Sequence, residues 1–219
     1  MELYLVRHGE TESNKQKRYQ GWTESPLSEK GLRQAENAGL FLSRMEVSAV
    51  YSSDLNRAVN TAQVIGAARG LKPKVTPLLR EIHFGEWEGL TFEEIEKSWG
   101  HQISSWLDDP FHKAAPGGET LEKVCQRMRI FLEEVSGIHQ DGDRLVAVSH
   151  GGSIRALLYN LLSLDLPSFW EIRIDNASIS LVRREGEQFK VAYYNRTDHL
   201  AAGERGKDLA DDLKKYNRR

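Results

Sequence analysis

The 219-residue chain is nearly without cysteine: Cys125 is its single thiol. One cysteine excludes an internal disulfide. No charged and then apolar leader precedes the first predicted strand, and we expect a cytoplasmic protein. Cys125 belongs to an apolar stripe with helical spacing, which we expect in the core: Leu121, Val124, Cys125, Met128, Leu132 and Val135.

The chain also lacks an excess of charge of either sign. Its 30 Lys and Arg residues nearly balance 32 Asp and Glu residues, and the basic residues are dispersed. We therefore expect neither a nucleic-acid partner nor a membrane partner, and no apolar run approaches the length of a membrane span. Internal repeats, low-complexity segments and metal-ligand constellations are absent as well, so we expect no metal site and no cofactor.

Apolar runs and helical stripes alternate along the chain. This alternation predicts an α/β fold, a three-layer α/β/α sandwich with a mostly parallel sheet. We expect one domain over residues 1–200 and a polar tail over 201–219, which either forms a short helix at about 207–216 or frays. The expected strands are 2–7, 47–51, one within 72–79, 144–149 and the hairpin 177–183 and 188–194, and the expected helices are about 28–44, 55–69, 119–136 and 153–163.

One segment, about 88–116, interrupts this alternation. A stripe of apolar residues like the one it carries is more often packing than ligand contact, by roughly three to one. The stripe consists of Phe92, Ile95, Trp99, Ile103, Trp106, Leu107 and Phe111.

Two histidines follow apolar strands in matching contexts. The first strand ends in Arg7-His8-Gly9, and the run 145–148 ends in Ser149-His150-Gly151 before a helical stretch. If both strands lie in one parallel sheet, both histidines emerge at the same edge. An imidazole placed there, beside a turn that glycine permits, is suited to nucleophilic attack on a phosphate.

A third strand-like run, at 47–51, leads into a helical pattern with Arg57 in its first turn. A cation at this end of a helix is electrostatically unfavourable unless an anion joins it. Arg57 is therefore a candidate anion-binding residue.

Four blocks in this order resemble the histidine phosphatase superfamily, also called the phosphoglycerate mutase-like family. They are LVRHGET at 5–11, YSSDLNRAVNTA at 51–62, LREIHFGEWEG at 79–89 and VSHGG at 148–152. Any one of them alone is a weak signal, but four in order over residues 3 to about 200 are specific. The resemblance is greatest to the α-ribazole phosphatase and broad-specificity phosphatase branch.

The resemblance implies a role for each matching residue. His8 matches the nucleophile that becomes phosphorylated, and Glu81 matches the proton donor to the leaving group. Arg7 and Arg57 match the phosphate-binding arginines, and His150 the second histidine of that pocket. Residues that match positions lining the pocket are Asn14, Gln20, Gly21, Trp22 and Gly151.

Without the resemblance, the sequence also allows ordinary structural roles for these residues. Arg7 could be a surface cation, and His150 a hydrogen-bonded histidine of the core. Asn14 could equally be a turn residue, and Glu81 one of several solvated acids in an acid-rich stretch.

The chemistry of a phosphate monoester accounts for these residue types. Cations must neutralise the dianion and the charge that develops on its oxygens. Arginine makes bidentate contacts and stays charged, so no metal is required. The attacking imidazole must be neutral, and nearby arginines disfavour its protonated form. An alkoxide leaves poorly, so a carboxyl group must protonate it, and the same group can later activate water.

Members of this family place a substrate cap near 88–116, where the mutases carry paired arginines. The segment here has no arginine. This departure favours a phosphomonoesterase with a bulkier, partly apolar small-molecule substrate, such as α-ribazole 5′-phosphate. The alternatives are a phosphoserine or sugar-phosphate phosphatase, a mutase, and, as the least favoured reading, a non-catalytic regulatory module. The oligomeric state stays open, with a homodimer as one option.

Overall fold

The computed structural model describes residues 1–205 and contains one six-stranded sheet. The strand order is β3-β2-β4-β1-β5-β6. The first four positions in this order are parallel strands, and the last two form an antiparallel hairpin. The predicted fold class is thereby confirmed, whereas the helix considered at about 207–216 lies outside the described residues. The strands are β1 (Glu2–Arg7), β2 (Ala49–Ser53), β3 (Lys74–Thr76), β4 (Arg144–Ser149), β5 (Ile179–Glu185) and β6 (Gln188–Arg196).

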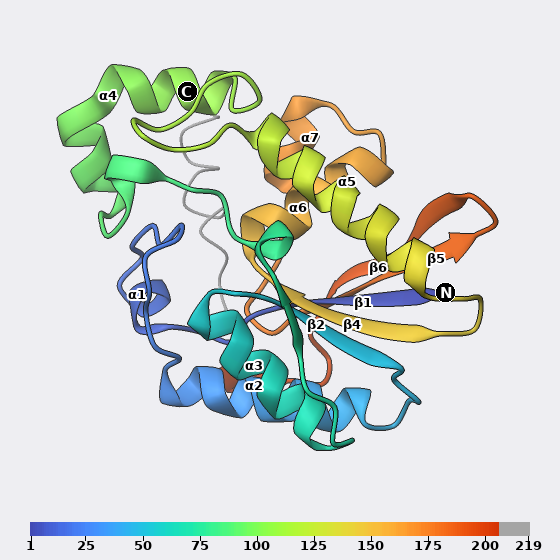
Figure 1. Ribbon diagram of the computed structural model, residues 1–219. Helices are drawn as coiled ribbons and strands as arrows, with labels where there is room; N and C mark the ends of the chain where they lie inside the picture. The colour runs from blue at the N-terminus through green and yellow to red at the C-terminus, as the bar shows by residue number, and fades with distance from the viewer. Residues whose placement is uncertain (206–219) are drawn as a thin grey trace.

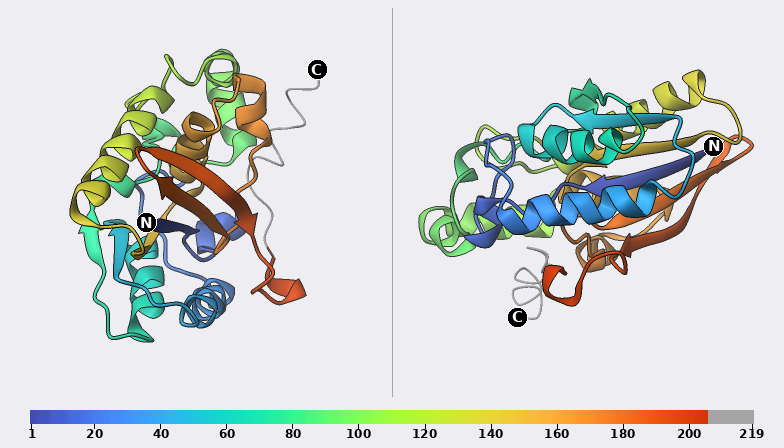
Figure 2. Two further views of the ribbon diagram at one scale, coloured as in Figure 1. Left: turned by 90° about the vertical axis from the view of Figure 1, so that its right-hand side faces the viewer. Right: turned by 90° about the horizontal axis from the view of Figure 1, so that it is seen from below.

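Helices cover both faces of the sheet, as Figures 1 and 2 show. The helices α2 (Glu29–Leu42) and α3 (Asn56–Ala67) lie on one face, and α5 (Leu121–Ile138) and α6 (Gly151–Leu161) on the other. Within residues 1–205, no helix is both long and apolar enough to cross a membrane. The remaining helical elements are α1 (Glu12–Lys15), α4 (Phe92–Asp108), α7 (Leu166–Glu171) and the 3-10 turns η1 (Pro77–Leu79), η2 (Gly85–Trp87) and η3 (Ala202–Glu204).

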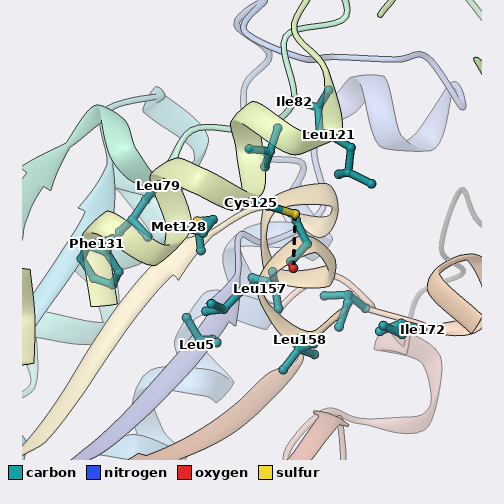
Figure 3. Close-up of a cluster of buried hydrophobic side chains, with 14 of the residues drawn as sticks. Leu5, Leu79, Ile82, Leu121, Cys125, Met128, Phe131, Leu157, Leu158 and Ile172 are labelled. Carbon is teal, nitrogen blue, oxygen red and sulfur yellow. Dashed lines mark hydrogen bonds between the residues drawn. The ribbon is translucent and has the colours of Figure 1, made fainter. Parts of the chain in front are cut away.

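Two apolar cores flank the sheet because side chains alternate along each strand. In β1, Leu3 and Leu5 pack on the α5 and α6 side, whereas Tyr4 and Val6 pack on the α2 and α3 side. Figure 3 shows the first core, in which Cys125 is buried and its Sγ donates to the Ala156 carbonyl. The core position expected for Cys125 is thus confirmed.

The segment 88–116 mainly forms α4, which begins at a capping box on Thr91 and is kinked at Trp99. Five members of its apolar stripe are buried, so most of the stripe packs into the core as expected. In Figure 1, α4 lies beyond the end of the sheet at which β1 finishes.

Strand β2 spans 49–53, two residues later than expected. Its last residues, Ser52 and Ser53, are fully buried although polar, because their hydroxyls bond within the turn that leads to α3. Because serine is polar, the hydropathy pattern of the sequence ends the strand at Tyr51 and places Ser52 and Ser53 in the following loop. The short helices α1 and α7 were likewise not expected, since four and six residues carry too little periodicity to predict.

Candidate active site

The two histidine motifs meet at the carboxyl edge of the sheet. Strands β1 and β4 are adjacent and parallel, with Arg7 opposite Ser149, so the next residues, His8 and His150, lie side by side. Their ring centroids are 5.0 Å apart, with the ring planes tilted by 59°. The expected arrangement of the two strands is confirmed, and both imidazoles are buried.

The hydrogen bond of His8 indicates which of its ring nitrogens can attack. His8 Nδ1 lies 2.7 Å from the carbonyl oxygen of Gly9. Since a carbonyl oxygen only accepts, the proton of the neutral ring is on Nδ1 and the lone pair is on Nε2. The backbone also fixes the residue, because His8 N donates to Ser149 O at 3.0 Å and Asn176 Nδ2 donates to His8 O at 3.2 Å.

Both rings are held in the neutral form. Burial lowers the pKa of His8 well below its usual value, and the charges of Arg57 and Arg7 lower it further. Burial also lowers the pKa of His150, with Arg57 as the next cause. A neutral imidazole is the form that a nucleophile requires.

His150 is the N-cap residue of α6 and is fully buried. Among residues 1–205, neither of its ring nitrogens has a hydrogen-bond partner. A buried polar group without a partner is costly, roughly 1–3 kcal/mol, and is usually retained for a functional reason. The ring is therefore suited to contact a ligand that also reaches His8.

Two arginines supply positive charge at this edge. Arg7 is the last residue of β1, and Arg57 lies in the first turn of α3; both side chains are buried. A Cβ at position 151 would lie 3.3 Å from the Arg7 guanidinium carbon, so Gly151 permits a close approach of α6. At the N-terminus of α3, the Glu24 carboxylate accepts from Asn56 N at 3.0 and 3.2 Å and supplies an anion that the sequence did not identify.

Glu81 lies in the loop after η1 and faces the start of α6. Its Oε2 accepts from Gly152 N at 3.1 Å and its Oε1 from Ile82 N at 2.9 Å. Its carbonyl accepts from Trp22 Nε1 at 2.9 Å and from Arg127 at 3.0 Å. These contacts fix Glu81 in the lining of the cavity that Arg7 and His8 also line.

The residues expected to line the pocket are placed as follows. Asn14 Oδ1 accepts from Asn176 Nδ2 at 3.1 Å, and Gln20 Oε1 accepts from Thr11 at 2.9 Å. Asn14, Gln20, Gly21 and Gly151 line the cavity. Trp22 is not among the described residues that line it; this side chain lies outside, stacked on His83 with ring centroids 4.4 Å apart.

The cavity is open to solvent and is lined by apolar and aromatic side chains together with a few charged groups, a composition typical of small-molecule sites. Arg7, His8, Arg57 and Glu81 lie at its polar end. Of the segment 88–116, Trp106 and Pro110 reach it. Lining residues that the sequence did not identify are Tyr19, Ile82, Phe84, Trp106, Pro110, Leu121, Gly152, Arg155, Phe169 and Trp170.

Arg155 is a third buried arginine at this cavity. It lies one turn after Gly151 on α6, its Nε donates to Ile172 O at 2.8 Å, and its guanidinium lies 5.6 Å from the Phe169 ring centre. Helical spacing from Gly151 could have identified it, because residues four apart share a helix face.

The polar end of the cavity has the properties of a site for a tetrahedral anion. The guanidinium groups of Arg7 and Arg57, the imidazole of His8 and the carboxyl group of Glu81 line it, whereas His150 is fully buried against the His8 ring and is not among the described residues that line the cavity. Among residues 1–205, no cluster of three or more His, Cys, Asp or Glu side chains could hold a metal ion. An anion bound here would meet a nucleophilic nitrogen and a proton-transfer group together.

Comparison with known proteins agrees with this chemistry. The sequence matches the model of the histidine phosphatase superfamily (branch 1) over residues 3–197. Phosphoserine phosphatase 1 of Hydrogenobacter thermophilus is 37% identical over 200 residues, which cover 91% of this chain and 94% of that protein. The adenosylcobalamin/alpha-ribazole phosphatase of Escherichia coli K12 is 30% identical over 182 residues, or 83% of this chain and 89% of that protein.

Solved structures of related proteins have the same fold. The structure of YhfR from Bacillus stearothermophilus matches with a TM-score of 0.86 and 32% identity, over 91% of this chain and 99% of that one. The chain therefore belongs to branch 1 of the histidine phosphatase superfamily and is a phosphatase of that family.

Proposed function

We propose that this protein hydrolyses a small-molecule phosphate monoester through a phosphohistidine on His8 Nε2. The observation that carries the proposal is the buried, neutral His8, whose Nδ1 is bonded to Gly9 O, beside Arg7 and Arg57 in one cavity. This arrangement aims a lone pair at the place where two guanidinium groups would hold a phosphate.

In the first step, His8 Nε2 attacks phosphorus. The N–P bond forms as the bond between phosphorus and the leaving oxygen breaks, and the protonated Glu81 carboxyl group donates its proton to that oxygen. Arg7, Arg57 and His150 stabilise the charge on the phosphoryl oxygens.

In the second step, the Glu81 carboxylate accepts a proton from a water molecule that attacks phosphorus. The new O–P bond forms and the N–P bond breaks. Inorganic phosphate is released, and His8 returns to its neutral form. The proton taken from water restores the Glu81 carboxyl group, so one ester and one water give one alcohol and one phosphate.

The far end of the cavity supports a partly apolar leaving group. Among the described residues, the Phe, Tyr and Trp side chains that line the cavity are Tyr19, Phe84, Trp106, Phe169 and Trp170, and Arg155 lies beside Phe169. The α-ribazole 5′-phosphate of the named relative is a candidate because its leaving group carries a flat ring system. Phosphoserine, suggested by another relative, and sugar phosphates are the alternatives and offer less apolar surface.

We further propose that residues 1–200 act as a single domain in which 88–116 is a cap over the leaving group. Trp106 supports this, since it comes from α4 and lines the cavity. The cytoplasmic location stays a prediction, and the oligomeric state stays open.

The test of the nucleophile is trapping of the phosphoenzyme. Incubation with ³²P-labelled ester, rapid quench and peptide mapping should place an acid-labile, base-stable phosphate on His8. His8→Ala should keep its fold by circular dichroism and lose both label and turnover. Label on the His8→Ala protein would contradict the proposal.

A screen of phosphorylated metabolites, ranked by kcat/KM, then identifies the substrate class. The same protein, given labelled monophosphoglycerates, tests the mutase alternative. Transfer of label between the two phosphoglycerate isomers would support a mutase, and release of inorganic phosphate alone supports hydrolysis.

A further inference from the structure

The guanidinium group of Arg57 is oriented by a loop from another part of the chain. Arg57 donates through Nη2 to Gly21 O at 2.6 Å and through Nη1 to Thr23 O at 3.1 Å. The side chain is 1% exposed. The position of the loop 20–23 therefore fixes the direction in which Arg57 faces the cavity.

A single carboxylate, that of Glu88, holds this loop. Its Oε2 accepts from Thr23 N at 2.7 Å and from the Thr23 hydroxyl at 2.5 Å. Its Oε1 accepts from Trp22 N at 2.9 Å and from Phe84 N at 3.1 Å. Four donors thus converge on one side chain that is only 10% exposed.

The backbone of the loop is shaped around the same carboxylate. Gly21 has a φ of +51°, and a Cβ there would lie 2.0 Å from Glu88 Oε1. A side chain at position 21 would displace the Glu88 carboxylate, and the left-handed backbone at this position also favours glycine. Gly89 N also donates to Tyr19 O at 2.7 Å, which ties the two segments together on the other side of Glu88.

The negative charge of Glu88 also favours the charged form of Arg57. Burial lowers the pKa of Arg57, whereas the nearby carboxylates of Glu81, Glu24 and Glu88 raise it and so favour the charged guanidinium. Glu88 contributes both the geometry and part of the electrostatic environment of a buried cation.

We propose that Glu88 is a positioning residue that orients Arg57 toward the phosphoryl group through the loop 20–23. This inference rests on the proposed function, in which Arg57 binds the phosphate. Glu88 does not line the cavity among residues 1–205, so it is placed to act through Arg57 and the loop and not by touching the anion.

The test compares Glu88→Gln with Glu86→Gln, an exposed neighbour on the same stretch. The glutamine amide can accept from only one pair of the four donors, and its NH₂ group faces the other pair. We expect the Ki of inorganic phosphate and of vanadate to rise about tenfold in Glu88→Gln, the effect of losing hydrogen bonds near a charged group. Glu86→Gln should bind both anions like the wild type.

A role in stability alone would not move these readouts. Ki does not depend on the concentration of folded enzyme, whereas a loss of folded enzyme would lower the apparent kcat/KM of every substrate by the same factor, so Ki is the deciding measurement. An unchanged Ki in folded Glu88→Gln would overturn the inference. If Glu88→Gln does not fold, the exposed Thr23→Val, which removes one of the four donors, should raise Ki by about threefold.

A double-mutant cycle tests whether the effect of Glu88 on anion binding depends on Arg57. Arg57→Lys removes the guanidinium that bonds to the two loop carbonyls, so adding Glu88→Gln should then change Ki less than twofold. If the two substitutions change Ki by independent factors that multiply in the double variant, the positioning role is overturned and the proposed function stays intact. An Arg57→Lys protein that binds phosphate like the wild type would overturn the proposed function and this inference with it.

Discussion

Glu81 and Gly152 are in contact where the loop after η1 meets the first turn of α6. Gly152 N donates to Glu81 Oε2 at 3.1 Å, and a Cβ at position 152 would lie 2.5 Å from Glu81 Oε1. The glycine therefore leaves the space that the carboxyl group occupies. The hydroxyl of Ser153 also donates to Arg80 O and fixes the same junction.

This contact predicts the effect of Gly152→Ala. The new methyl group should displace the flexible Glu81 side chain, since misplacing a catalytic group by about 1 Å can cost on the order of 100-fold in rate. We expect kcat to fall at least tenfold while the Ki of phosphate changes little. Steady-state kinetics and phosphate inhibition measure both quantities.

Gly137→Ala is the matched control, because Gly137 lies in α5 and, apart from its chain neighbours and the backbone of its own helix, no atom of the described residues lies within 4 Å of its added Cβ. It should keep wild-type kinetics. A Gly152→Ala enzyme with wild-type kcat would show that Glu81 is not placed by this contact.

The pH dependence of stability follows from the two buried imidazoles. The pKa of both His8 and His150 is lowered by burial and then by Arg57, so the native rings stay neutral when unfolded ones take up protons. Their contribution is fully present above the unfolded pKa of about 6.5 and is lost as pH falls below it. Between pH 7.5 and 5.0, each ring should lower the free energy of unfolding by up to about 2 kcal/mol.

Urea unfolding at the two pH values checks this. His150→Asn should show a shallower loss than the wild type, whereas His101→Asn, an exposed residue of α4, should show the same loss. His199, whose pKa is also lowered by burial, is common to all three proteins and does not affect the comparison. Equal losses in His150→Asn and the wild type would contradict the neutral, buried state of His150.

His8, His150 and Arg57 were predicted from local signals, whereas the prediction of Glu81, Asn14, Gln20 and Gly21 rested on the family resemblance. His8 and His150 each follow an apolar run and precede glycine, and β1 and β4 turned out to be neighbours. Arg57 was identifiable because helical spacing places it in a first turn. Such signals need only a few consecutive residues, so no tertiary contact has to be known.

The parts that the sequence did not predict depend on contacts between distant segments. Trp170 comes from the six-residue helix α7 and reaches the cavity only because α7 packs beside α6. Asn176 donates through Nδ2 to the His8 carbonyl. The next residue, Ala177, has a φ of +55°, and an alanine in a sequence gives no indication of such a left-handed backbone. Trp22 was expected at the cavity, and its adjacency to Gly21 in sequence gave no information on the direction of its side chain.

The aromatic end of the cavity should determine the choice of leaving group. Trp106 packs edge to face against Trp170, with ring centroids 5.4 Å apart, and both line the cavity. Trp106→Phe should lower kcat/KM for p-nitrophenyl phosphate relative to phosphoserine by roughly fivefold, because less apolar surface meets the ring.

Trp99→Phe on the same helix is the control, since among the described residues Trp99 is not part of the cavity lining. It should keep the wild-type ratio of the two kcat/KM values. If both variants shift this ratio equally, the change reflects the packing of α4 and not contact with the leaving group.

Glu81→Gln separates proton transfer from binding. A nitrophenolate leaves without a proton, whereas an alkoxide does not, so the variant should slow alkyl phosphates far more than p-nitrophenyl phosphate. General acid catalysis typically contributes about 10²–10⁴-fold, and we expect the two substrates to diverge by at least tenfold in the step that phosphorylates His8.

The phosphoenzyme burst must be measured, because Glu81 also serves the attack of water in the proposed mechanism and would slow both substrates equally at steady state. Glu86→Gln serves as control, as a nearby carboxylate that is exposed and that is not among the described residues lining the cavity. Its burst should match that of the wild type for both substrates. Equal slowing of the burst for both esters in Glu81→Gln would remove Glu81 from the role of acid. A loss for alkyl esters alone in Glu86→Gln would transfer that role to Glu86.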